Sequence, residues 1–240
     1  MNILLTNDDG YNSKGIQILK ELLSKYATVI IVAPDSPRSG SSASLTIHEP
    51  LKLIKVEEGV YKCSGTPVDC VALGLECFSI DFDLVVSGCN NGLNISYDTM
   101  YSGTVGAALE ALIFRKPAIA VSSPWSEEEQ FENVINWFDR VWAFITENEL
   151  ISKEYILNIN FPKDAAREYK LGGLYYRNDE HLFIEENGSY FTKRHLQLDY
   201  SDQPESDCFQ VEHGIISIVP LAKSYFNPSI KEELEKKINE

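Results

Sequence analysis

Two adjacent carboxylates, Asp8 and Asp9, are the residues whose types and spacing most directly suggest chemistry. They follow a short apolar run, Asn2–Thr6, and like charges so close together repel each other unless a positive group lies beside them. A divalent cation held by oxygen ligands is one arrangement that removes this repulsion. A polar turn in which an Asp caps a helix is the other, and the pair alone does not decide between them.

Two further apolar runs also end in polar clusters. The run Thr28–Pro34 leads into a serine-rich stretch that includes Ser39, and the run Asp83–Gly88 leads into Asn90 and Asn94. The carboxyl ends of parallel strands meet at one edge of an open sheet, so these clusters are expected to converge with the two aspartates. Their hydroxyl and amide oxygens are suited to completing the shell of Mg²⁺ or Mn²⁺.

Two segments suggest an anion site. Tyr101–Val105 runs directly into a helix of small residues, and either Ser102 or Thr104 can cap it, so that its first N–H groups face a phosphate. The stretch Arg38–Ser42 offers hydroxyl and backbone donors. An ordinary helix cap and a flexible surface loop are the plainer interpretations, and a cap is compatible with anion binding.

The elements that would position these residues alternate between strands and helices over the first half of the chain. This order predicts an α/β fold with parallel strands. Strands are expected at Asn2–Thr6, Thr28–Pro34, Asp83–Gly88, Pro117–Ser123, Ile156–Pro162 and Ile215–Pro220, and helices at Gly15–Tyr26, Thr66–Phe78, Thr104–Lys116, Phe131–Glu147 and Ser229–Glu240. We interpret residues 1–240 as one domain, with a core over about 1–165. Residues 166–240 form an irregular extension containing Tyr- and Phe-rich hairpin or extended material, the late strand and the C-terminal helix.

The composition limits the classes of protein. The 240 residues carry 21 Lys and Arg against 36 Asp and Glu, a net charge of −15. Binding to long nucleic acids or to anionic membranes is therefore not expected. No apolar run approaches the ~18 residues of a membrane span, and the N-terminus lacks a basic leader region. The five cysteines include no C-x-x-C pair, which predicts a reducing, cytoplasmic setting. P-loop, G-x-G-x-x-G and G-x-S-x-G motifs are absent from the sequence.

Several motifs in order resemble the SurE family of survival-protein nucleotidases. The strings are NILLTNDDG, APDSPRSGSSASLT, GTPVDCV, VVSGCNNGLN and YSGTVGAALEAL, followed later by ILNINFP and SDCFQVEHGIISIVPL. The resemblance is close over residues 1–125 and patchy beyond. It implies a three-layer Rossmann-like core with a C-terminal extension used in dimer or tetramer assembly. It also implies a cytoplasmic, metal-dependent hydrolase of nucleoside 5′- and 3′-monophosphates that sometimes accepts short polyphosphates.

The resemblance also implies roles for individual residues. The implied metal ligands are Asp8, Asp9, Ser39 and Asn90. The implied substrate and phosphate contacts are Gly40, Asn94, Ser102, Gly103 and Thr104. Two departures from the family pattern stand nearby: Ile95–Asp98 replaces a Gly-Asp-Asp-type turn, and Cys89 replaces an aliphatic residue beside Asn90.

The predicted reaction is phosphomonoester hydrolysis with Asp8 and Asp9 as the catalytic carboxylates and one Mg²⁺ or Mn²⁺ ion per subunit. The nucleophile is either a water oriented by Asp8, which we favour, or the Asp8 carboxylate itself. Two alternatives remain at this stage. One is a phosphatase that proceeds through an aspartyl-phosphate. The other is a non-catalytic nucleotide-binding regulatory module.

Overall fold

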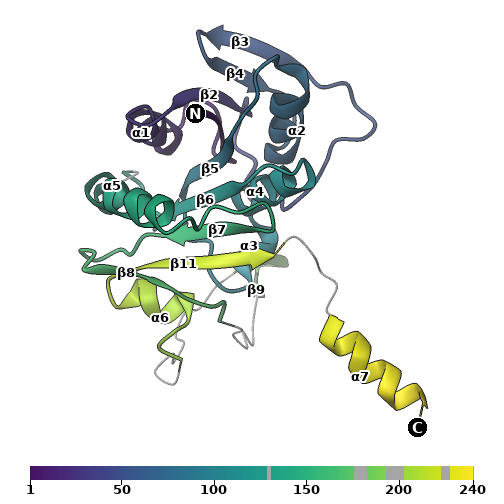
Figure 1. The fold of residues 1–240 in the computed structure, drawn as a ribbon. Coiled ribbons are helices and arrows are strands. Elements are labelled where there is room, and N and C mark those ends of the chain that lie inside the picture. The colour runs from purple at the N-terminus through teal and green to yellow at the C-terminus, as the bar shows by residue number, and fades with distance from the viewer. Residues whose placement is uncertain (129–130, 176–182, 193–202, 223–227, 240) are drawn as a thin grey trace.

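The computed structural model of the chain describes residues 1–128, 131–175, 183–192, 203–222 and 228–239 (Figure 1). Within these residues a nine-stranded sheet runs through the molecule with helices on both faces. The α/β class with a mostly parallel, Rossmann-like sheet is thereby confirmed.

The sheet is parallel through its middle and mixed at its two edges. Its strands are β1 (Asn2–Thr6), β2 (Thr28–Pro34), β3 (Leu53–Glu57), β4 (Val60–Cys63), β5 (Leu84–Asn91), β6 (Ala118–Ser123), β7 (Tyr155–Asn160), β8 (Glu168–Leu171) and β11 (Ile215–Ala222). Their order is β3-β4-β2-β1-β5-β6-β7-β11-β8. Neighbours from β4 to β7 are parallel, whereas β3 is antiparallel to β4 and β11 is antiparallel to β7.

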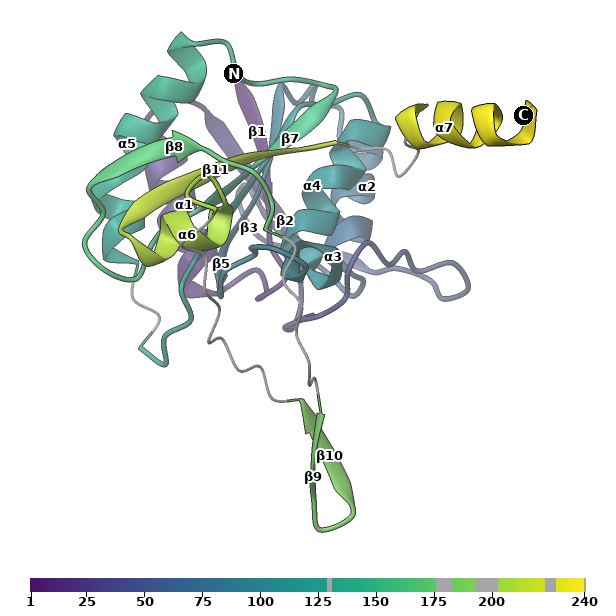
Figure 2. The same cartoon turned by 90° about the horizontal axis from the view of Figure 1, so that it is seen from below.

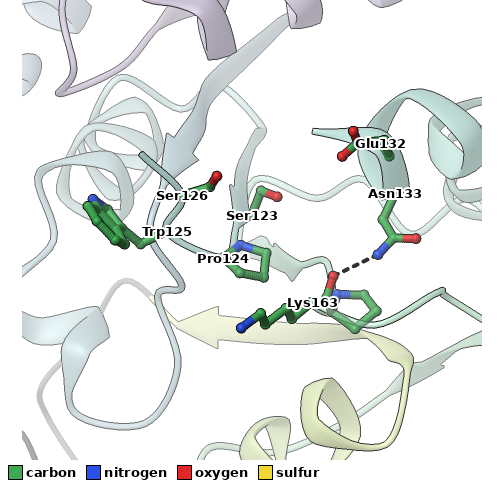
Figure 3. A pocket seen from close by; sticks show the side chains of 8 residues that line it. Ser123, Pro124, Trp125, Ser126, Glu132, Asn133 and Lys163 are labelled. Atoms are coloured by element: carbon green, nitrogen blue, oxygen red, sulfur yellow. Dashed lines mark hydrogen bonds between the residues drawn. The ribbon is translucent and has the colours of Figure 1, made fainter. Parts of the chain in front are cut away.

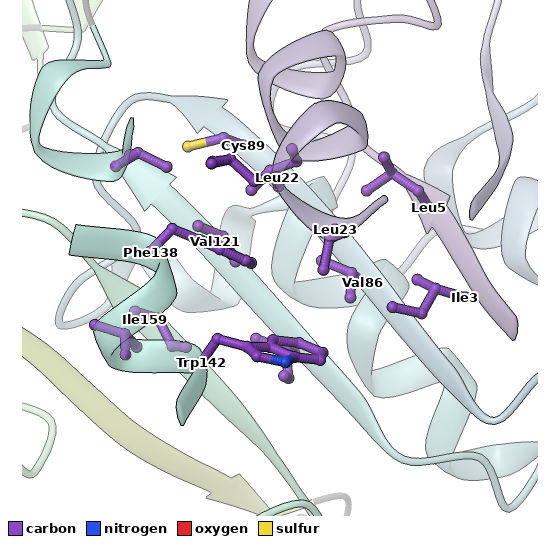
Figure 4. Close-up of a cluster of buried hydrophobic side chains, with 14 of the residues drawn as sticks. Ile3, Leu5, Leu22, Leu23, Val86, Cys89, Val121, Phe138, Trp142 and Ile159 are labelled. Carbon is purple, nitrogen blue, oxygen red and sulfur yellow. The ribbon is translucent and has the colours of Figure 1, made fainter. Parts of the chain in front are cut away.

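Helices α1 and α5 cover one face of the sheet, and α2 and α4 cover the other. The helices of the described residues are α1 (Lys14–Leu23), α2 (Pro67–Cys77), α3 (Asp98–Tyr101), α4 (Gly103–Ile113), α5 (Glu132–Glu147), α6 (Asp207–Glu212) and α7 (Pro228–Asn239). Side chains of a strand alternate between faces, so Ile3 and Leu5 pack with α1 and α5 while Leu4 packs with α2 and α4. Figure 4 shows the first of these cores, with Leu23 of α1 and Trp142 of α5 over the strands.

The last third of the chain adds strands to the sheet and elements outside it. Strand β11 pairs with β7, and α6 packs against β11. Strands β9 (Phe183–Glu186) and β10 (Ser189–Thr192) form a hairpin around Asn187 and Gly188, both with positive φ, as a two-residue Asn-Gly turn requires. The hairpin projects from the body in Figure 2, and α7 lies apart from it in Figure 1. In the described part of the chain no helix has the length and apolarity needed to span a membrane.

Most predicted elements are present within a few residues of the expected bounds, and two groups differ. Strand β5 continues past Gly88 to Asn91, because the ladder with β6 shifts register after Ser87 and resumes where Asn90 pairs with Ser122. Strands β3, β4 and β8 and helix α6 were not expected. β3 and β8 are mostly exposed edge strands, so they lack the apolar signal on which the predictions depended.

The order of strands places a switch point between β1 and β5. The chain passes from β1 to β2 on one side and later returns to β5 on the other side of β1. Loops that follow β1 and β5 therefore border the crevice where ligands bind in such sheets. This is the edge at which the polar clusters were expected to converge.

The packing of α1 on β5 yields a prediction about Gly15. A Cβ at this position would overlap the carbonyl oxygen of Cys89 in β5. Alanine is favoured over glycine inside a helix by ~1 kcal/mol, so any loss must come from this collision. We expect Gly15→Ala to lower the free energy of unfolding by about 2 kcal/mol, as overpacked cores do. Urea denaturation measures this change.

The control for this experiment is Gly173→Ala. A Cβ at Gly173 meets no heavy atom within 4 Å, so this variant should unfold with nearly the wild-type midpoint. Equal stability of the two variants would show that α1 is not held against β5 as closely as described.

Candidate functional site

The turn after β1 is fixed by a side chain that sequence analysis did not single out. Asn7 accepts a hydrogen bond from the N–H of Gly10 at 3.1 Å, and its Nδ2 donates to the carbonyl oxygen of Gly10 at 3.0 Å and to Ser13 Oγ at 2.7 Å. The side chain is fully buried. Asn7 therefore closes the loop on itself and sets the positions of the two aspartates that follow it.

Asp8 is the centre of the site. Only 4% of this residue is exposed, and its Oδ1 accepts a hydrogen bond from Thr104 Oγ1 at 2.6 Å. Burial raises the pKa of the Asp8 carboxyl, while the Thr104 hydroxyl and the backbone amides of Thr104 and Gly103 partly offset this rise in pKa. Because Gly103 and Thr104 begin α4, the carboxylate lies at the positive end of that helix.

This arrangement changes the expectation for the start of α4. We expected free N–H groups there to face a phosphate, but those of Gly103 and Thr104 interact with Asp8. The Val105 N–H donates to Ser102 Oγ at 3.1 Å, so Ser102, one of the two predicted candidates, is the N-cap. The helix start thus holds the site's own carboxylate. Direct phosphate contacts from Ser102, Gly103 and Thr104 remain a prediction.

Gly103 is needed because Asp8 and Ser41 approach it closely. A Cβ at this position would lie 2.5 Å from Ser41 Oγ and 3.1 Å from Asp8 Oδ2. The Ser41 hydroxyl is buried and has no hydrogen-bond partner among the described residues. In the sequence, Ser41 is distinguished only as part of the serine-rich stretch. In the structure, its unsatisfied oxygen and the Asp8 carboxylate both lie against Gly103.

Asp9 and Asn90 occupy the neighbouring strand ends. The Asn91 N–H at the end of β5 donates to Asp9 Oδ2 at 3.1 Å, which joins the β1 turn to β5. The side-chain Nδ2 of Asn90 donates to the carbonyl oxygen of Gly92 at 2.8 Å. With Nδ2 bonded in this way, Oδ1 is the atom of Asn90 suited to binding a cation.

The serine-rich loop is tied to both sides of the crevice. The Arg38 N–H donates to the carbonyl oxygen of Asp8 at 2.7 Å, and the Ser42 N–H donates to that of Tyr101 at 3.0 Å. Between these anchors Ser39 and Gly40 are exposed. The roles predicted for these two residues stay predictions.

Asn94 lies in a separate polar cluster at the ends of β6 and β7. Its Nδ2 donates to Ser122 Oγ at 2.8 Å, and its carbonyl oxygen accepts from the side chains of Asn158 and Asn160 at 2.8 and 3.0 Å. All of these side chains are buried. These contacts fix the loop that follows β5, and the phosphate contact predicted for Asn94 remains a prediction.

The segment Ile95–Asp98, which departs from the family pattern, is anchored by a residue from the C-terminal part of the chain. The Ser96 N–H donates to Asp207 Oδ2 at 2.7 Å, and the φ of Ser96 is 51°. Asp207 also accepts from the N–H of Tyr175 at 3.0 Å, and burial raises the pKa of its carboxyl. Asp207 was not predicted as functional. Ser206, the N-cap of α6, is the sequence feature that could have indicated a helix beginning at Asp207.

The donor atoms fit a hard divalent cation. In the part of the chain that the structure describes, no three His, Cys, Asp or Glu side chains form a metal-binding group. A cation here would take two carboxylates and neutral oxygens, which suit Mg²⁺ or Mn²⁺ better than a softer metal. A buried carboxylate with a raised pKa beside an unsatisfied hydroxyl is an environment that a positive ion would stabilise.

Comparisons with known proteins agree with one another. Residues 3–179 match the family model of the survival protein SurE. The chain is 34% identical over 250 residues to the 5′-nucleotidase SurE of Clostridium botulinum (strain Alaska E43 / Type E3), covering 98% of this chain and 99% of that protein. It is 37% identical over 262 residues to the 5′-nucleotidase SurE of Acinetobacter baylyi, covering 98% of each. The crystal structure of the SurE protein from Aquifex aeolicus superposes with a TM-score of 0.87 at 32% identity over the whole of both chains.

The hydrogen bond from Thr104 to Asp8 yields a prediction for the metal-free protein. Thr104→Val removes the hydroxyl that favours the charged carboxylate, so the pKa of Asp8 should rise further above its ordinary range. A folded pKa above the unfolded one means that stability falls as the pH rises through the folded pKa. Carbon NMR should show the Asp8 carboxyl of Thr104→Val ionising at a higher pH than that of the wild type.

Thr104→Ser is the matched control, because it keeps the hydroxyl. Its Asp8 pKa should stay close to that of the wild type. An unchanged pKa in Thr104→Val would mean that the hydroxyl does not stabilise the charged carboxylate.

Proposed function

The chain belongs to the SurE family, and we propose that it is a metal-dependent 5′-nucleotidase that releases phosphate at the site around Asp8 and Asp9. The observation that carries the proposal is the buried Asp8 carboxylate at the start of α4, with Asp9 and an unsatisfied Ser41 hydroxyl beside it. Nucleoside 5′- and 3′-monophosphates are the proposed substrates, with short polyphosphate as a further one.

One Mg²⁺ or Mn²⁺ ion per subunit is part of the proposal. Asp8, Asp9, Ser39 and Asn90 would hold it. A cation at this place would offset the charge of a phosphate oxygen and lower the pKa of a water molecule. Its support in the structure is the donor set, which consists of two carboxylates and neutral oxygens at one edge of the sheet.

The chain's own residues then bind and orient the phosphate. Ser39 and Gly40 lie on the exposed loop and would offer donors to phosphate oxygens, while the buried Ser41 hydroxyl lies behind them without a partner. The backbone amides of Gly103 and Thr104 also lower the pKa of Asp8, so the start of α4 would serve both the carboxylate and the phosphate. Phosphate contacts from Asn94, Ser102, Gly103 and Thr104 stay part of the proposal, with Ser102 acting as the cap of the helix.

The geometry of Asp8 favours a water nucleophile. Its Oδ1 accepts the short hydrogen bond from Thr104, and donors that stabilise a carboxylate also reduce its nucleophilicity. A water oriented by Asp8 leaves the carboxylate in place. The alternative, attack by Asp8 itself, would form an aspartyl-phosphate that can be trapped. Inversion of configuration at an isotopically chiral phosphoryl group would favour direct attack by water, whereas retention would favour the two-step course through an aspartyl-phosphate.

The two aspartates yield the central prediction. Asp8→Asn and Asp9→Asn should each lower phosphate release from nucleoside monophosphates by at least about 100-fold, because each removes a charge that the reaction depends on. Circular dichroism should show that both remain folded. The assay is phosphate release with Mg²⁺ or Mn²⁺, repeated with a chelator, which should abolish the activity.

Asp81→Asn is the control, since Asp81 is an exposed surface residue paired with Lys116. Normal hydrolysis by either aspartate variant would show that the site is wrong. Binding of nucleotide by the wild type without phosphate release would instead favour a regulatory module.

We also propose a homodimer or homotetramer in the cytoplasm. Support for assembly comes from exposed apolar side chains on the two elements that lie outside the sheet. Phe183 and Tyr190 of the β9–β10 hairpin are 63% and 71% exposed, and Leu234 and Ile238 of α7 are 52% and 80% exposed. Apolar residues four apart lie on one face of a helix, so α7 presents an apolar stripe that a partner copy would bury.

This assembly predicts an effect of Leu234→Glu. A charge within the stripe of α7 should shift the protein to a smaller species in size-exclusion chromatography with light scattering. Lys236→Glu changes the charge of the same helix by more and should leave the mass unchanged. An unchanged mass in both variants would show that α7 is not part of the interface.

A further inference from the structure

A cavity lies on the same edge of the sheet as the aspartates. Its volume is about 220 Å³, and it is open at the carboxyl ends of β6 and β7. The residues that line it include Ser123, Pro124, Trp125, Glu132, Asn133 and Lys163. Pockets that enclose a drug-sized molecule measure ~300–1,000 Å³, so this cavity suits a part of a ligand, such as one ring system.

The cavity is one strand away from the proposed metal site. Asn90 and Asn91 of β5 pair with Ser122 and Ser123 of β6, and adjacent strands lie ~4.8 Å apart. The Asn91 side chain also exchanges two hydrogen bonds with the backbone of Ser126, each 3.0 Å long. Because the Asn91 N–H donates to Asp9, one residue joins the carboxylate directly to the loop that carries Trp125.

Trp125 presents its indole to solvent beside this cavity. It is 66% exposed, whereas Trp142 is 6% exposed and stacks on Phe138 in the core. Figure 3 shows Trp125 on one side of the cavity and Glu132 and Asn133 of α5 on the other, with Ser123 and Pro124 between them. An exposed indole face is the surface on which nucleobases stack, and every base has a face that fits it.

The far side of the cavity offers groups that can contact the edge of a base. Glu132 supplies a carboxylate acceptor and Lys163 supplies an ammonium donor, and both are exposed. Asn133 serves the scaffold, because its Nδ2 donates to the carbonyl oxygens of Pro162 and Asp164. The cavity therefore combines one aromatic wall with a polar wall of both charges.

We propose that this cavity is the base subsite of the enzyme, in which the nucleobase stacks on Trp125 while the phosphate lies at Asp8 and Asp9. The proposal rests on the nucleotide substrate proposed above and names the part of the chain that recognises the nucleoside. Stacking contributes affinity without reading base identity, so the subsite accepts all bases and binds the larger purines more tightly.

The test compares substrates with and without a base in Trp125→Ala and Trp125→Phe. In Trp125→Ala, the KM for purine nucleoside monophosphates should rise about tenfold with kcat nearly unchanged. Ribose 5-phosphate has no base, so its kcat/KM should change less than twofold. Trp125→Phe keeps an aromatic face and should restore most of the affinity for nucleotides.

Met100→Ala is the control for a competing position of the nucleoside. Met100 is 61% exposed and lines another cavity, of about 310 Å³, beside Ser42 and Ser102. A rise in nucleotide KM in Met100→Ala and not in Trp125→Ala would overturn the proposal. So would an equal loss for nucleotides and ribose 5-phosphate in Trp125→Ala, because that would indicate general damage to the site.

Direct binding separates this proposal from the proposed function. Adenosine, which has a base and no phosphate, should bind the wild type in calorimetry and bind Trp125→Ala at least fivefold more weakly. Equal adenosine affinity in the two proteins would overturn the base subsite. Absence of phosphate release from every substrate by the wild type would instead contradict the nucleotidase, whatever adenosine does.

Discussion

The burial of one carboxylate, Asp8, at the start of α4 is the constraint on which the rest of the site depends. Removing a charged group from water is costly unless donors or an opposite charge replace the water. Thr104 supplies a hydroxyl, and the first turn of α4 supplies backbone amides and the positive end of its dipole. These groups offset the effect of burial only in part, so the pKa of the Asp8 carboxyl stays above its ordinary value.

The same constraint explains why small residues surround the site. Gly103 allows Asp8 and Ser41 to reach the helix start, and Gly106 lets the backbone of Ser42 cross its first turn. On the opposite face of the sheet, Gly15 brings α1 against Cys89, immediately before Asn90. Close packing thus holds the ends of β1 and β5 from both sides. The two strand ends bear the aspartates and the amide, so their spacing is set by the core.

The sequence predicted the parts of this arrangement that depend on local pattern. Asn2–Thr6 and Thr28–Pro34 have the predicted bounds, because buried parallel strands are uninterrupted apolar runs. The convergence of the turn after β1 with the end of β5, where the Asn91 N–H donates to Asp9, followed from the rule that ligand loops lie at the carboxyl edge of the sheet.

What the pattern could not supply was the partner of each side chain. The hydrogen bond from Thr104 to Asp8 joins residues 96 positions apart, and the one from Ser96 to Asp207 spans 111 positions. Neither leaves a trace in spacing or periodicity. For the same reason the sequence did not reveal that the backbone amides of Gly103 and Thr104 also act on the Asp8 carboxylate, whose pKa they lower. Tertiary contacts decide which anion occupies a helix start.

Charge balance connects this site to the composition of the whole chain. A phosphate dianion that approaches two carboxylates in a protein of net charge −15 meets repulsion of ~4 kcal/mol for each pair of unit charges 4 Å apart at a dielectric constant of 20. A neutral donor such as Ser41 contributes only about 1.5–3 kcal/mol to a charged acceptor, so a single donor cannot reverse it. The proposed cation therefore decides whether the substrate enters at all. A single phosphate needs one such ion, whereas a nucleic acid would need basic contacts along its whole length. On this account the acidic surface and the metal act together, and both favour a small substrate over a polymer.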